Sequence, residues 1–452
     1  MLGKNGCKII LLSFFLFLIT SCATNPAEYK ELDNSIENSK YREAVDEITA
    51  RQGSKKPLYS EKNAIMLFLD KGLLEYYAGD YQKSSQSLQE AERLIEEAYT
   101  KSITADFLSY ILNDNTKDYP GEDFEDIYIN IFNALNYYKR GDLSGALVEI
   151  RKLSAANGKL DMLARKYEYK DPNSGASLEE LTKREANSAE LPKGKKVDFN
   201  NSALARYLAV LFYLADGKND SARIEYEQLQ MAFLTNRNVY KNPIPKIAAQ
   251  LNNVPKGKAM LNIIAFSGLS PVKEEEIISY PFPMFQYSML TSANFKLPKM
   301  VQRPSKIDRI EVTVNSNKFN LELLEDMSAV VNETFANHYA NIAIKTYIRT
   351  ILKYAAVAVA ASEAEKIEQS GFLILTGVIA AKIAFEATER ADIRMSRYFP
   401  GKAHVGGIIL DPGTYNVTVN FYSGNAVISK EEYSNFNVRE NGINLIDVVS
   451  LK

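Results

Sequence analysis

Residues 134–153 read ALNYYKRGDLSGALVEIRKL. Apolar and small side chains recur at helical spacing on both sides of Gly141, which is followed at once by an aspartate. Glycine adopts the left-handed backbone conformation at little cost, so it commonly ends a helix at a tight turn. Similar stretches surround Gly79 and Gly217. The sequence therefore predicts three α-helical hairpins in the first half of the chain.

These three segments resemble tetratricopeptide repeats. Their turn glycines are 62 and 76 residues apart, whereas a regular array repeats about every 34 residues. The expected architecture is therefore an irregular, tetratricopeptide-like array of helical hairpins over residues 41–241. A further helix is expected over residues 122–139, where apolar side chains follow a helical period.

Strands are expected in the second half, which we predict to be a separate mixed domain over residues 242–452. Prolines concentrate between residues 243 and 304, and they interrupt helices, so we place the domain boundary there. Short apolar runs and alternating patterns indicate mostly antiparallel strands, and Asp411-Pro412-Gly413-Thr414 is typical of a type II turn. The expected strands span residues 259–266, 307–314, 319–323, 405–410, 415–421, 426–429 and 443–451. The fold class is α+β, with C-terminal strands over residues 403–451.

A long Ala-rich helical hairpin is expected over residues 325–397, with its helices at about 325–368 and 372–397. Its longest apolar run, residues 372–381, is ended by Lys382 and has about half the length that a bilayer span requires. Alanines at every fourth residue allow two helix backbones to approach closely. Two interpretations are open: a buried hairpin or oligomer contact, and a hairpin that touches a membrane or lines a pore.

The amino terminus looks like a bacterial lipoprotein signal. A basic start and an apolar run lead to Leu18-Ile19-Thr20-Ser21-Cys22, which resembles a lipobox. Residues 1–21 would be removed and Cys22 acylated, so residues 22–40 would be a polar tether. Cys7 is lost with the signal, which leaves Cys22 as the one cysteine. Ala23, rather than Asp, follows it, and we therefore expect the outer membrane.

Composition excludes several classes of protein. The 452 residues carry 54 basic and 56 acidic side chains, so no excess of positive charge is present to bind nucleic acid. Two histidines and two cysteines are too few for most metal sites built from these residues. We find no phosphate-binding loop, nucleophile elbow or zinc-protease helix. His338 and His404 are expected to be structural, and we predict no enzyme activity, no cofactor and no metal.

Asp392, Arg394 and Arg397 form the most suggestive polar cluster. Arginine forks can hold a carboxylate or a phosphate, so the cluster predicts either an intramolecular clamp or an anion site. Glu122 and Asp123 open the helix expected at 122–139, where acidic side chains are stabilised by the helix dipole. As a catalytic pair for carbohydrate they are poorly arranged, because adjacent helical residues point in different directions.

Several stretches resemble a family of bacterial envelope lipoproteins with tetratricopeptide-like repeats. The stretches that carry the resemblance are ITADFL (103–108), YPGEDFE (119–125), ALNY (134–137), GDL (141–143), ALVEIR (146–151), GLSPVK (268–273), ADIRMSR (391–397) and DPGTY (411–415). The resemblance implies the fold and an envelope location, and it implies no particular activity.

Two functional hypotheses follow. The first is a lipid-anchored, non-enzymatic scaffold whose paired helices offer a concave surface to another envelope protein. The second is a component of an export or surface-polymer assembly machinery, in which the Ala-rich hairpin contacts the membrane. The sequence predicts no oligomeric state.

Overall fold

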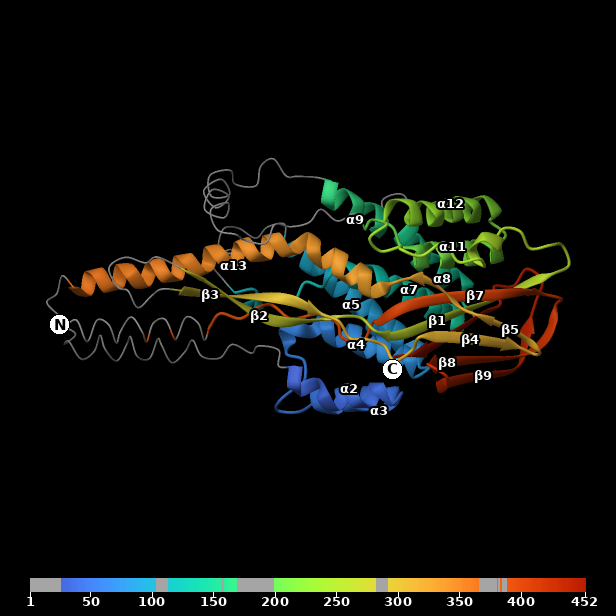
Figure 1. Ribbon diagram of the computed structural model, residues 1–452, viewed down its shortest axis with the longest axis horizontal. Helices are drawn as coiled ribbons and strands as arrows, with labels where there is room; N and C mark the ends of the chain where they lie inside the picture. Colours follow the sequence, from blue (N-terminus) through green and yellow to red (C-terminus); the bar gives the residue numbers. More distant parts are fainter. Residues whose placement is uncertain are drawn as a thin grey trace.

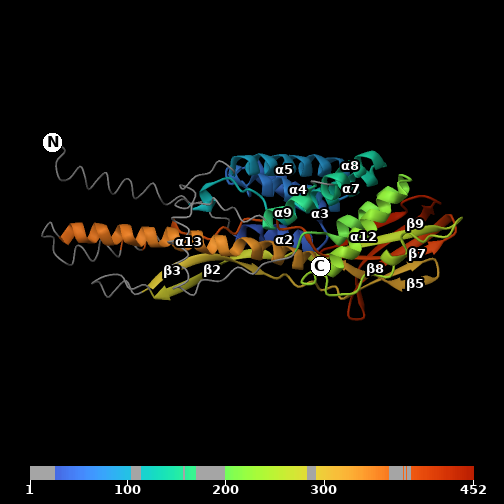
Figure 2. The same ribbon diagram turned by 90° about the horizontal axis from the view of Figure 1, so that it is seen from above.

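The computed structural model describes residues 26–102, 113–155, 158–168, 199–281, 292–365, 380, 383 and 388–452. Helices from the first half of the chain cover one face of a β-sheet, and a second sheet covers the other face (Figure 1). A long helix and a two-stranded ribbon project from this three-layered body as an arm (Figure 2). The fold is α+β, as the sequence predicts.

The helical layer consists mainly of paired helices. Its α-helices are α2 (Lys30–Glu37), α3 (Tyr41–Gln52), α4 (Ala64–Tyr77), α5 (Tyr81–Ser102), α7 (Asp123–Lys139), α8 (Leu143–Ser154), α9 (Lys159–Glu168), α11 (Ala203–Ala215) and α12 (Asn219–Thr235). Short 3-10 helices lie at η1 (Pro26–Tyr29), η2 (Glu61–Asn63), η3 (Asp114–Thr116) and η4 (Ala248–Gln250). The helix expected at residues 122–139 is α7.

The three turn glycines adopt the left-handed conformation that the sequence predicts. Their φ angles are +80° at Gly79, +78° at Gly141 and +71° at Gly217. At Gly141 the N–H groups of residues 141 and 142 donate to the carbonyls of Tyr138 and Tyr137, both at 2.9 Å. This is the Schellman pattern, which satisfies carbonyls left free at a helix end. Gly79, Gly217 and Ser39 show the same pair of bonds, so four helical hairpins share one type of turn.

The strands form three sheets. Their bounds are β1 (Ala259–Leu269), β2 (Val272–Pro281), β3 (Ser292–Val301), β4 (Arg309–Val314), β5 (Asn317–Asn320), β6 (Glu322–Glu325), β7 (Pro400–Leu410), β8 (Gly413–Ser423), β9 (Ala426–Val438) and β10 (Leu445–Ser450). The central sheet has the order β10-β1-β7-β6, the outer sheet β5-β4-β8-β9, and β2 pairs with β3 alone. All pairings are antiparallel except that of β10 with β1, which is parallel.

Strand β1 lies at the centre of the molecule and is buried on both faces. Side chains of a strand alternate between faces. Accordingly, Phe266 packs against Phe132 of α7, with 5.2 Å between ring centroids. On the other face, Leu261 and Ile263 join the cluster that contains Val419 of β8. The continuous apolar run of this strand reflects its position between helices and the second sheet.

Two boundaries expected from the sequence differ from the structure. One cluster of buried apolar side chains includes residues on both sides of the expected domain boundary at 241/242, so the two halves share a core. The expected tether at 22–40 is also too long, because η1 and α2 occupy residues 26–37. Tyr29, Leu32 and Ile36 are fully buried there, and burial of these apolar side chains fixes the segment to the body.

The turn expected at residues 411–414 also differs. A type II turn requires a positive φ at its third residue, and Gly413 has none. Instead, residues 411 and 412 connect β7 of the central sheet to β8 of the outer sheet. The chain therefore crosses between two layers at the point where we expected a type II turn.

The arm consists of α13 (Met327–Glu365), β2 and β3 (Figure 2). Helix α13 confirms the first helix of the expected hairpin, and most of residues 372–387 lie outside the described residues. Phe295 of β3 stacks on Tyr347 of α13 with centroids 5.5 Å apart, so ribbon and helix support each other. Across the described helices, none combines the length and the apolar character that crossing a membrane requires.

Replacement of a turn glycine should destabilise the fold through the backbone alone. A Cβ atom at Gly141 would meet nothing within 4 Å, so Gly141→Ala leaves the packing intact and introduces only the left-handed strain. We expect the free energy of unfolding to fall by about 1 kcal/mol in urea titrations. Gly53→Ala is the matched control, because its φ of −81° suits any residue. An equal loss in both variants would contradict the assignment.

Candidate functional site

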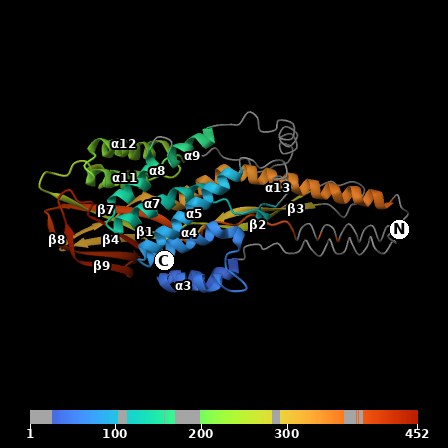
Figure 3. The ribbon, with the colours of Figure 1, turned by 180° about the vertical axis from the view of Figure 1, so that it is seen from behind.

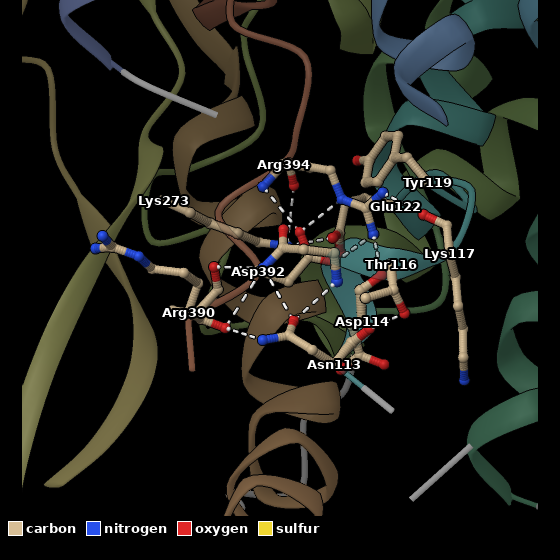
Figure 4. A network of polar contacts seen from close by, with 12 residues as sticks. Asn113, Asp114, Thr116, Lys117, Tyr119, Glu122, Lys273, Arg390, Asp392 and Arg394 are labelled. Atoms are coloured by element: carbon tan, nitrogen blue, oxygen red, sulfur yellow. Dashed lines mark hydrogen bonds and ion pairs between the residues drawn. The ribbon is translucent and has the colours of Figure 1, made fainter. Parts of the chain in front are cut away.

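The polar cluster predicted from the sequence lies in residues 389–399, which we call the clamped segment. This segment is not helical, so the expectation of a helix extending to Arg397 is wrong. It runs between the helical layer and β2 and leads into β7 at Pro400 (Figure 4).

Arg394 is the centre of the cluster and is 3% exposed. Its guanidinium forms a bidentate pair with Asp392: Nε to Oδ1 and Nη2 to Oδ2 are both 2.8 Å. Nη1 donates to the carbonyl of Lys117 at 2.8 Å, and Nη2 also donates to that of Asp114 at 2.9 Å. The guanidinium lies 5.4 Å from the centre of the Tyr119 ring. Arg394 therefore joins the clamped segment to the loop that precedes α7 (Figure 4).

A second buried cation, Lys273 of β2, completes this network. Its ammonium group pairs with Glu122 and donates to the carbonyl of Arg394 at 3.4 Å. Burial alone would raise the pKa of Asp392, but the hydrogen bonds and charge of Arg394, with the charge of Lys273, hold it below its usual value. Arg394, Lys273, Asp392 and Glu122 thus form a charge-balanced network of two cations and two anions between β2, α7 and the clamped segment.

The carboxyl half of the clamped segment is held by two buried acids of the helical layer. Asp70 of α4 accepts hydrogen bonds from the Ser396 hydroxyl at 2.6 Å and from the Arg397 N–H at 2.8 Å. Glu125 of α7 accepts from the Ser396 N–H at 2.6 Å. The Arg397 side chain donates to Asp33 of α2 at 2.8 Å. Three helices that are far apart in the sequence therefore converge on two residues, Ser396 and Arg397.

These contacts explain why the segment does not form a helix. A helix pairs its own N–H and C=O groups, whereas here side chains from elsewhere occupy them. The carbonyl of residue 391 accepts from Asn115, and the N–H of residue 391 donates to Glu275. The carbonyl of residue 397 accepts from Arg303. Helical periodicity in the sequence contains no information about such distant partners.

The hydrogen bonds describe an intramolecular clamp. Both hydrogens of Arg394 Nη2, its Nε–H and one hydrogen of Nη1 are directed at atoms of this chain, so little donor capacity is left for an external anion. Among the described residues, the buried Nε of Arg397 has no hydrogen-bond partner, while its Nη2 is held by Asp33. The cluster serves to hold two halves of one molecule together.

Burial shifts the titration of both clamping acids. It raises the pKa of Glu125 to about 8, helped by the nearby charge of Glu122. It raises the pKa of Asp70 to about 6, although hydrogen bonds from Ser396, Tyr59 and Arg397 oppose the shift. Both acids accept a hydrogen bond from a tyrosine hydroxyl, Tyr119 and Tyr59 respectively, at 2.8 Å.

Glu325, at the end of β6, shows the same arrangement elsewhere. It accepts hydrogen bonds from Tyr128 at 2.6 Å, from Tyr240 at 2.7 Å and from the N–H of Leu204 at 3.0 Å. Burial raises its pKa. A buried acid between tyrosine hydroxyls is thus a recurring joint between the helical layer and the second half.

The remaining candidates from the sequence also have partners within the chain. Glu122 pairs with Lys273, while Asp123 lies 2.8 Å from His338 Nε2. The two acids therefore bind different groups rather than facing one site. His404 lies in β7, where burial lowers its pKa to about 4. Within the described ranges, no group of three or more His, Cys, Asp or Glu side chains is placed to hold a metal ion.

A cavity of about 510 Å³ lies between α11, α12 and the loops around residues 251–258 and 440–443. Two of its cationic lining residues are paired within the chain: Arg223 with Glu227 at 2.6 Å and Lys258 with Asp411 at 2.7 Å. The cavity offers no arrangement of groups that points to a particular ligand.

Comparison of the chain with protein-family models, curated proteins and solved structures finds no match. Cys22 lies outside the described residues.

Sequence reasoning missed the acids that hold the clamped segment. One signal was available: Asp70 directly follows the apolar stretch AIMLFL (64–69) in the same helix. An acid on the buried face of a helix requires a partner. The identity of that partner, 326 residues further along the chain, could not be read from the local pattern.

Loss of the Arg394 guanidinium should strongly destabilise the protein. Arg394→Met leaves the Asp392 carboxylate and two partly buried carbonyls without their donor, and removal of one member of a buried pair costs about 3–5 kcal/mol. We expect this loss in the free energy of unfolding, measured in urea. Arg223→Met is the control, because that ion pair is exposed and should have little effect. Similar losses in the two variants would argue against a buried clamp.

Stability should fall as the pH rises through the titration of Glu125. Its pKa in the fold, about 8, is above its ordinary value of 4.5. The protonated side chain therefore contributes its full stabilisation of the fold below about pH 4.5, and this stabilisation is lost as the pH rises through 8. Between about pH 6.5 and 8, Asp70 is already ionised. In this window we expect Glu125→Gln to reduce the fall of the free energy of unfolding with pH by up to ~1.4 kcal/mol per pH unit. Urea titrations at several pH values measure this slope.

Glu43→Gln, at an exposed acid of α3, serves as the control and should keep the wild-type slope. An unchanged slope in Glu125→Gln would show that this acid does not titrate in the window.

Proposed function

We propose that this chain is a lipid-anchored protein of the cell envelope that acts as a non-enzymatic scaffold, binding another envelope protein through its outer helices. The observation that carries the proposal is the distribution of exposed apolar side chains over the helical layer. The clamp adds support, because its charged groups are directed within the chain.

The inner helices of the hairpins are covered by the protein's own sheet. Helix α11 has eleven of its 13 residues buried, and Tyr207 from its middle donates to Asn262 of β1 at 3.1 Å. The concave surface that we expected the paired helices to offer a partner is therefore occupied. A partner of the helical layer must bind its outer side.

The outer helices expose large apolar side chains. Helix α12 has only four buried residues, and Ile224, Met231 and Leu234 are all more than 40% exposed. The other exposed large apolar residues of this layer are Tyr99 of α5, Val148 of α8 and Met162 of α9. Exposed apolar residues that are grouped rather than scattered are typical of protein-binding surfaces. Figure 3 shows α8, α9 and α12 on one side of the body.

The anchor is the second part of the proposal. The lipobox-like sequence before Cys22 supports acylation, and several acyl chains on one residue hold a protein stably at a bilayer. The absence of Asp after Cys22 favours the outer membrane.

A second candidate function is a component of an export or surface-polymer assembly machinery. The projecting arm favours it, since α13 continues well beyond the body (Figure 1). Leakage of dye from liposomes on addition of the Cys22→Ser chain would support this candidate, and retention of the dye would argue against it.

Photo-crosslinking from the outer helices tests the scaffold function. A photoreactive phenylalanine analogue in place of Met231, on α12, should give a discrete adduct with another envelope protein in intact cells. The same analogue in place of Val427, which is 48% exposed on β9, is the matched control. Equal adducts at both positions, or none at Met231, would refute binding by the outer helices.

Mass spectrometry of the same preparations tests the anchor. The mature chain should begin at acylated Cys22, and Cys22→Ser should move the protein from the membrane to the soluble fraction. An unmodified, internal Cys22 would refute the lipid anchor while leaving the crosslinking result interpretable.

A further inference from the structure

The folded body begins very close to the proposed lipid. Pro26 starts η1, and Tyr29 is already buried, with the Arg397 guanidinium 4.6 Å from its ring centre. Asp33 of α2 holds the same guanidinium. Only three residues, 23–25, therefore separate Cys22 from the first residue of the body.

Those few residues limit how far the body can stand from the bilayer. Fully extended, the four steps from Cys22 to Pro26 span about 14 Å. Helix α13 has 39 residues. From His338, where it contacts α7 through Asp123, it continues for 27 residues to Glu365, about 40 Å at 1.5 Å per residue. The arm is thus much longer than the tether.

The arm and the start of the body lie on the same side. In Figures 1 and 3 the first described residues, in the deepest blue, are at the side of the body from which α13, β2 and β3 project. The arm is also fixed part-way along its length, since Arg349 of α13, beyond His338, pairs with Glu389 of the clamped segment at 2.9 Å and both side chains are buried. It cannot fold away without breaking that pair.

We propose that the arm lies against the surface of the bilayer that holds Cys22. The tether holds the bilayer surface within about 14 Å of Pro26, and the arm projects about 40 Å from the same side of the body. An arm pointing at the bilayer would cross its surface, so the arm must run along it. This inference rests on the proposed lipid anchor. The arm also exposes an apolar side chain suited to an interface, Ile277 of β2, which is 58% exposed.

Site-specific fluorescence tests this contact on the full lipidated chain. Acylation blocks the sulfur of Cys22 and no other cysteine remains after residue 21, so one introduced thiol can be labelled uniquely. Ile277→Cys on the arm and Asn437→Cys on β9 would each carry an environment-sensitive dye. Asn437 is exposed and pairs with Thr414, so it lies at the end of the sheets toward which β7 runs from the clamped segment. The probe is a vesicle of phosphatidylethanolamine and phosphatidylglycerol that contains a nitroxide-labelled lipid.

We expect the nitroxide to quench the dye at position 277 several-fold more strongly than the dye at position 437. Equal, weak quenching with acylation confirmed by mass spectrometry would overturn the arm contact and leave the anchor intact. Lack of acylation would instead overturn the proposed function.

A lengthened tether provides the second variant. Insertion of about 20 Gly and Ser residues after Ala23 keeps the acylation signal and gives the body freedom to leave the surface. Quenching at position 277 should then fall to the level of position 437. Undiminished quenching would overturn the argument that the short tether brings the arm to the bilayer.

Discussion

The arrangement of this molecule depends on hydrogen bonds between two buried carboxyl groups and one short stretch of the chain. Asp70 and Glu125 lie in different helices, yet both bind Ser396, and Asp70 also binds the N–H of Arg397. Because a hydrogen bond fixes both distance and direction, these bonds position the residues that lead into β7. Strand β7 pairs with β1 and β6, so the central sheet and the helical layer are aligned through the same contacts.

The local features of the fold could be predicted from the sequence. The turns at Gly79, Gly141 and Gly217 depend on a backbone conformation that glycine adopts easily, so the residue itself reveals them. The continuous apolar run of β1 likewise reflects burial on both faces. In each case, the cause lies within a few residues of the feature. The parallel pairing of β1 with β10, about 180 residues further on, has no such local sign.

The features that could not be predicted depend on distant partners. Residues 389–397 carry a helical pattern, but their backbone groups are bound by side chains such as Asn115 and Glu275, and the helix does not form. The separate domains expected on either side of residue 241 share a core because apolar faces from both halves meet. The cluster of Asp392, Arg394 and Arg397 was recognised as polar and paired, whereas Asp33, Asp70 and Glu125, which bind its neighbourhood, were not.

The position of β10 has a consequence for the order in which the protein can mature. This strand is formed by residues 445–450 and lies beside β1, while Asp447 within it binds Tyr76 and Lys139 of the helical layer. Residues 445–450 therefore complete the hydrogen-bond ladder of β1 and pair with a partly buried lysine. Until these residues leave the ribosome, this edge of β1 is open, and the nascent chain depends on protection from aggregation.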